Sequence, residues 1–111
     1  MLLALITVLL TPWHGPSLPS APTGEYSTKY SLSVRGAAHE RVDLQAAGVA
    51  KGWIAAFCTP TLCAVFHKSL ILDNHGTGRL EFELVRVDPK ASPHTRVVIE
   101  ANNRVVARAS R

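Results

Sequence analysis

The chain has 111 residues, with 12 lysines and arginines against 8 aspartates and glutamates, and a formal net charge of +4. This length corresponds to one small domain. The basic residues are scattered and do not alternate with aromatic residues, which excludes the basic stripe of a nucleic-acid-binding protein, and we expect no nucleic-acid partner.

The N-terminal segment, residues 1–10, is apolar and uncharged. It is too short to cross a bilayer, which needs ~20 apolar residues, but it matches the apolar region of a secretory signal peptide. No Lys or Arg precedes it, and the alternative is a buried N-terminal strand or helix. We expect a signal peptide over residues 1–21, a linker over 22–25, no transmembrane span in the mature form, and a secreted or periplasmic location.

From Tyr26 onward, apolar and polar residues alternate with period two, the pattern of strands with one buried face. The segment at 53–57 is apolar on both faces, which is typical of a strand inside a sandwich. Asn102 and Asn103 can adopt the positive φ angles of a tight hairpin turn. The spacing predicts an all-β sandwich of about seven strands over residues 26–111, with strands near 26–35, 41–46, 53–57, 70–72, 80–84, 97–101 and 104–109.

The chain contains two cysteines, Cys58 and Cys63, with Thr59 and Pro60 in the turn between them. In an exported protein this short spacing favours a local disulfide. The alternative is a redox pair, but such pairs usually have the C-x-x-C spacing and a helix N-terminus that lowers the thiol pKa. The sequence alone leaves open whether the two thiols are oxidised.

A metal site is the second hypothesis. Cys63 and His67 stand four residues apart, and His39, His75 and His94 could join them in space. A structural zinc site draws four ligands from paired motifs, whereas only one pair occurs here. A blue-copper site uses an axial Met, and the one Met is Met1, inside the expected signal peptide. Turn and surface positions are therefore the favoured interpretation of these histidines.

Three other features of the sequence bear on a chemical function. Trp53 could be a ligand-stacking platform, although core packing is favoured for a large ring at the start of a strand. Glu81 and Glu83 lie on one strand face, where alternation with apolar residues predicts a solvated surface. Because no Gly-x-Ser-x-Gly elbow and no phosphate-binding glycine loop occurs, we expect neither an enzyme nor a cofactor.

The order of these elements resembles a known family. The residues that carry the likeness are a strand at 30–34, a turn, a second strand at 42–46, and Gly52-Trp53 opening a third. A Gly-rich turn and Glu-containing strand at 76–87 and a Pro loop with a final strand at 89–101 follow. From Tyr26 to Ala101 the chain resembles the bacterial extracellular Ig-like β-sandwich domains associated with α-galactosidases. The Cys58–Cys63 insert and the strand after Asn103 depart from that pattern.

The resemblance implies an Ig-like or fibronectin-III-like sandwich that acts as an accessory module without catalytic residues. Together with the apolar N-terminus, it leads us to expect a secreted or periplasmic interaction module that binds a protein or cell-envelope partner. The alternative function is a small copper- or zinc-binding extracytoplasmic protein that uses His67 with other histidines and cysteines.

Overall fold

The computed structural model describes residues 5–15 and 27–111. Within these ranges it contains nine strands and no helix. The expected linker at 22–25 and the expected end of the signal peptide at residue 21 lie outside the described residues. The strands are β1 (Thr7–Pro12), β2 (Ser27–Arg35), β3 (Arg41–Ala47), β4 (Trp53–Cys58), β5 (Cys63–Val65), β6 (His67–Ile71), β7 (Thr77–Arg86), β8 (Arg96–Ala101) and β9 (Arg104–Ser110).

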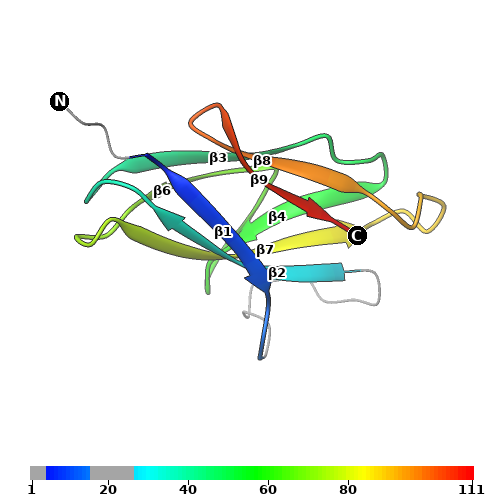
Figure 1. Ribbon diagram of the computed structural model, residues 1–111. Coiled ribbons are helices and arrows are strands. Elements are labelled where there is room, and N and C mark those ends of the chain that lie inside the picture. The colour runs from blue at the N-terminus through cyan, green and yellow to red at the C-terminus, as the bar shows by residue number, and fades with distance from the viewer. Residues whose placement is uncertain (1–4, 16–26) are drawn as a thin grey trace.

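The strands form two antiparallel sheets that face each other (Figure 1). The first sheet has the order β1-β2-β7-β4-β5 and the second has the order β6-β3-β8-β9. The predicted all-β sandwich is therefore confirmed. All seven expected strands are present, and β1 and β5 are additional to them.

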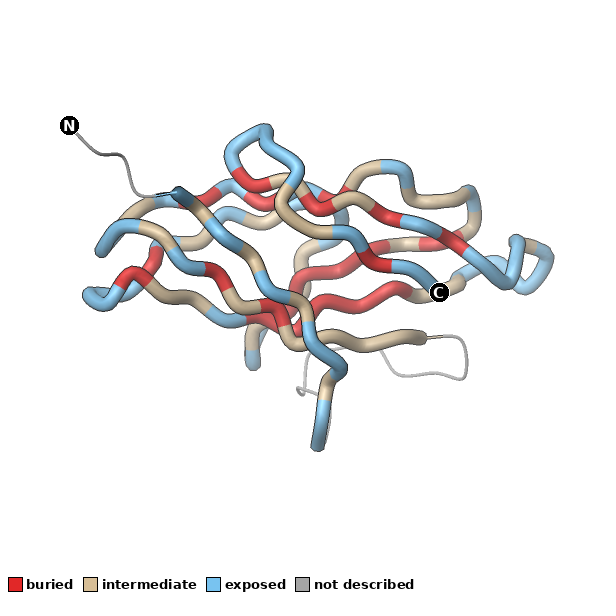
Figure 2. Tube along the Cα trace, in the orientation of Figure 1, coloured by how far each residue is buried: buried red, intermediate tan, exposed pale blue. Residues whose placement is uncertain are grey.

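The core lies between the two sheets and takes alternate residues from their inner strands (Figure 2). In β3 the burial alternates without a break, with Val42, Leu44 and Ala46 buried and their neighbours more exposed. Three rings on neighbouring strands contact one another across the first sheet: the ring centres are 6.2 Å apart for Tyr30 and Phe82, and 5.1 Å apart for Phe57 and Phe82. Such cross-strand pairs stabilise a sheet beyond the area that they bury.

Asn102 and Asn103 form the turn between β8 and β9 with φ angles of 48° and 68°, as their sequence predicts. Asn side chains tolerate this left-handed region better than most residues. Asn102 also accepts a hydrogen bond from the Asp43 amide at 2.8 Å, which ties the hairpin turn to β3.

The described part of the apolar N-terminal segment, from Leu5 onward, contributes an edge strand. β1 pairs with β2 from Thr7 opposite Arg35 to Pro12 opposite Tyr30. This placement corresponds to the alternative considered for the segment, although its residues are half-buried or exposed. Removal of residues 1–21 as a signal peptide stays a prediction.

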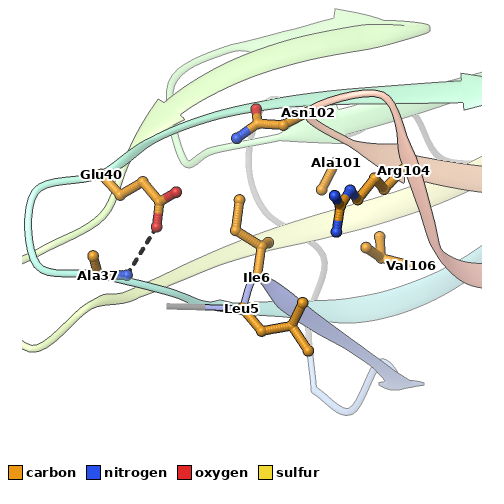
Figure 3. A pocket seen from close by; sticks show the side chains of 8 residues that line it. All are labelled: Leu5, Ile6, Ala37, Glu40, Ala101, Asn102, Arg104 and Val106. Atoms are coloured by element: carbon orange, nitrogen blue, oxygen red, sulfur yellow. Dashed lines mark hydrogen bonds between the residues drawn. The ribbon is translucent and has the colours of Figure 1, made fainter. Parts of the chain in front are cut away.

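At one end of the sandwich, a hollow of about 370 Å³ lies between the start of β1 and the β8–β9 hairpin. Figure 3 shows Leu5 and Ile6 on one side of it and Ala101, Arg104 and Val106 on the other. None of the described ranges contains a helix with the length and apolar character that a membrane span requires.

Candidate functional site

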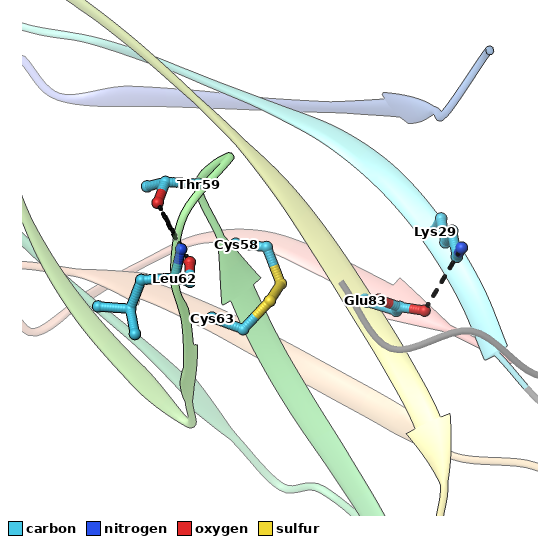
Figure 4. The surroundings of a disulfide bond; sticks show 6 residues. All are labelled: Lys29, Cys58, Thr59, Leu62, Cys63 and Glu83. Carbon is cyan, nitrogen blue, oxygen red and sulfur yellow. Dashed lines mark hydrogen bonds and ion pairs between the residues drawn. A yellow bond between two sulfur atoms is a disulfide. The ribbon is translucent and has the colours of Figure 1, made fainter. Parts of the chain in front are cut away.

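The hairpin between β4 and β5 is closed by a disulfide. Cys58 and Cys63 face each other in the strand register, with an S–S distance of 2.02 Å and a Cα–Cα distance of 4.0 Å. The turn is held by hydrogen bonds from the Thr59 amide to the Leu62 carbonyl at 2.8 Å and from the Leu62 amide to Thr59 Oγ1 at 3.2 Å. Figure 4 shows the Leu62 side chain pointing away from the bridge.

Exposed apolar side chains gather on the outer arm of this hairpin. Leu62 is 56% exposed, Val65 is 43% exposed and Phe66 is 41% exposed, all within five residues of the chain. We call these three residues the hairpin patch. Single exposed apolar residues are normal on a protein surface, whereas contiguous exposed apolar patches mark interaction sites.

Phe66 has the least usual backbone in this patch. Its φ angle is 69°, and for a bulky residue this left-handed conformation costs roughly 1–2 kcal/mol. Its amide donates to the Ala55 carbonyl in β4 at 2.8 Å, and its carbonyl accepts from the Ala46 amide in β3 at 2.8 Å. The two bonds, one to each sheet, hold the strained conformation where the chain crosses from β5 to β6. Strain of this kind is frequent at functional sites.

The expectation that Glu81 and Glu83 form a solvated face is wrong. Both side chains are 0% exposed, and they lie opposite Cys58 and Ala56 on the face of the first sheet that points away from the core. An alternating pattern separates the two faces of a strand, but it does not show whether the polar face is buried as well. Neither carboxylate reaches solvent in this conformation.

Burial changes the acidity of Glu83. Desolvation raises the pKa of Glu83 to about 7, with the Glu81 charge adding to the rise, while Lys29 and Ser27 oppose it. The Lys29 ammonium lies 3.9 Å from Glu83 Oε1 (Figure 4). A carboxyl group with this pKa is partly protonated at neutral pH, which reduces the cost of burying it.

Trp53 is not a ligand-stacking platform. Its ring is 4% exposed and belongs to the main core cluster, and its indole N–H donates to the Ser92 carbonyl at 2.7 Å. Gly52 before it has a φ of 85°, and a Cβ atom there would lie 2.5 Å from Ala91 Cβ. The Gly-Trp pair therefore docks the loop after β7 against the core, as the favoured interpretation of Trp53 predicts.

The residues of the metal hypothesis are not brought together. Cys63 is bonded to Cys58, so its thiolate cannot serve as a ligand. His39 and His75 lie in two neighbouring turns, where the backbone amide of each donates to Asp73. His94 lies elsewhere, with its ring Nδ1 3.1 Å from the Arg111 carbonyl oxygen. His67 is exposed on β6 opposite Gln45. In residues 5–15 and 27–111 no group of three or more His, Cys, Asp or Glu is placed to hold a metal ion.

The residues of the hairpin patch were not singled out by sequence reasoning, although they lie in the segment that contains the cysteines. A Val-Phe dipeptide reads as buried strand, and no local signal marks Phe66 for a positive φ angle.

The fold and the patch define a small disulfide-containing β-sandwich whose β4–β5 hairpin arm presents exposed apolar side chains. Comparison with models of protein families finds no family that matches the chain, and comparison with curated proteins finds no match either.

Proposed function

We propose that this chain is a secreted or periplasmic, non-catalytic Ig-like module that binds a protein or cell-envelope partner through the hairpin patch. The observation that carries the proposal is the exposed, strained Phe66 beside Leu62 and Val65. A protein partner that covers these side chains removes apolar area from water, which is the main driving force of association.

The disulfide supports an extracytoplasmic location. Disulfides persist in secreted and periplasmic proteins and are rare in the reducing cytosol. The Cys58–Cys63 bridge also fixes the hairpin arm that presents Leu62, and a rigid arm loses less conformational entropy when a partner binds.

Site-specific photo-crosslinking in the cells that produce the protein tests the proposal. A photoreactive amino acid is placed at Leu62 in one variant and at Val65 in another. Val87, which is also apolar and is 58% exposed, follows β7 at the other end of the sheet and is the matched control position. We expect one protein adduct of the same mass from positions 62 and 65 and none from 87. Equal adducts at all three positions, or no adduct at 62 and 65, would contradict the proposal.

A further inference from the structure

β1 is held on the sandwich by one side of its backbone and by alternate side chains. Among the described residues, its only strand partner is β2. Ile6, Val8 and Leu10 point inward and are partly buried against the core, whereas Leu5 and Leu9 point outward and are 71% and 63% exposed. The strand contains no charged residue. Its attachment therefore depends on the main chain and on an apolar residue at every second position.

Removal of β1 would uncover a defined groove. β2 would become the edge of the first sheet, and the backbone groups between Tyr30 and Arg35 that now bond to β1 would lose these partners. Its inward residues Leu32 and Val34, both 0% exposed, would lose their outer neighbour. The other wall of the groove is β9, where Val106 and Ala107 pack against the same core. An open apolar sheet edge of this kind is a template for pairing with another chain.

We propose that the groove between β2 and β9 is a strand-acceptor site. Its occupant is an extended segment of a partner protein that runs antiparallel to β2 and carries Ile, Val or Leu at alternate positions. Removal of residues 1–21, which the sequence predicts, takes β1 away and opens the groove. The inference deepens the proposed function, because it names a second way in which this module binds a protein. Strand addition gains affinity from main-chain bonds and specificity from alternate side-chain pockets.

Charge adds one preference to the partner's sequence. Arg35 is exposed and lies opposite Thr7 of β1 in the register. Opposite charges at directly facing positions of two strands attract, and like charges repel. A partner strand with Glu at the position of Thr7 should therefore bind more tightly than one with Lys there.

The test uses the full chain and a labelled peptide with the sequence of residues 5–12. Val8→Asp places a carboxylate on the inward face and should expel β1 from the groove. Leu9→Asp makes the same chemical change on the outward face and is the matched control. We expect fluorescence anisotropy to show the peptide binding Val8→Asp at least about tenfold more tightly than it binds the wild type or Leu9→Asp.

Circular dichroism covers the case in which Val8→Asp does not fold alone. Excess peptide should then restore its β spectrum, and a peptide that itself carries Val8→Asp should not. A folded variant that does not bind the peptide, an unfolded one that the peptide does not restore, or equal binding by Leu9→Asp would overturn the inference. The assay needs no natural partner, so its failure leaves the crosslinking test of the hairpin patch unaffected, and the reverse also holds.

Discussion

At the residue scale, Phe66 combines a strained backbone with an exposed side chain. A β-branched or aromatic residue gains nothing from a φ angle of 69°, since this region is open without cost only to glycine. The conformation is imposed by the two hydrogen bonds that its backbone makes to β3 and β4. The strain therefore belongs to the corner of the sandwich and should remain when the side chain is shortened.

Two variants at position 66 should therefore show an inverted order of stability. Phe66→Gly and Phe66→Ala both remove the ring, but alanine keeps the Cβ atom that disfavours a positive φ. We expect Phe66→Gly to be more stable than Phe66→Ala by roughly 1 kcal/mol, as measured by urea denaturation. At a position with ordinary φ the order is the reverse. A more stable Phe66→Ala would show that the corner relaxes when the ring is lost.

Glu83 is the second residue with a measurable consequence. Its pKa is raised from 4.5 to about 7 in the native protein. Between these two values the unfolded state has released its proton while the native state retains it, so the free energy of unfolding falls as pH rises. The contribution is complete below pH 4.5 and is lost through pH 7.

Glu83→Gln should flatten this dependence, because the amide is neutral at every pH. We expect the variant to gain stability relative to the wild type as pH rises between about 4.5 and 7. Denaturant midpoints measured across this range provide the test, with Glu100→Gln on β8 as the control. An unchanged slope in Glu83→Gln would mean that another group causes the dependence.

At the element scale, the β4–β5 hairpin depends on its disulfide. β5 has three residues, which is too few for a strand to be stable by pairing alone, and it lies at a sheet edge. The bridge closes a loop of a few residues, and the chain-entropy relation gives such a loop a stabilisation of about 2 kcal/mol.

The double variant Cys58→Ala/Cys63→Ala should therefore lose about 2 kcal/mol of unfolding free energy. In reducing agent the unfolding free energy of the wild type should fall by the same amount, and that of the variant should not change. Thiol titration of the denatured, exported protein should find no free thiol. Two free thiols would contradict both the bridge and the proposed location.

Seven strands could be predicted from the sequence because six of them have alternating side chains, while the seventh, at 53–57, is a short apolar run of the kind found inside a sandwich. β5 could not be, since three residues are too few to establish a period and its pairing is set by Cys58. β1 could not be separated from a signal sequence, because a run that is apolar on both faces has no period to read. Of the candidate site, the cysteine hairpin could be predicted, but the exposure of Leu62 and the conformation of Phe66 arise from tertiary contacts.

At the scale of the whole molecule, the two long sides of the sandwich are closed differently. On one side, the chain itself crosses between the sheets at Phe66 and bonds to both of them. On the other side, β1 lies beside β9 without belonging to the same sheet, and the Tyr30 hydroxyl donates to the Ser110 carbonyl at 2.7 Å. On the Phe66 side, the two sheets are therefore joined by the chain and by hydrogen bonds. On the other side, the edge strands β1 and β9 only contact each other.

The closure at Phe66 joins the two sheets along one long side of the sandwich, whereas the opposite side can separate at β1. The amide protons of Ala46 and Phe66 exchange only when the hydrogen bonds that join the two sheets break. Those of β1 exchange when this edge strand alone separates from β2. In the uncleaved chain, which retains β1, we expect hydrogen exchange, followed by NMR, to be slower at Ala46 and Phe66 than along β1. Equal rates at both sides would mean that the sheets part as a unit. The unequal pattern would mean that water first reaches the core where β1 separates from the sandwich, well before the global unfolding transition.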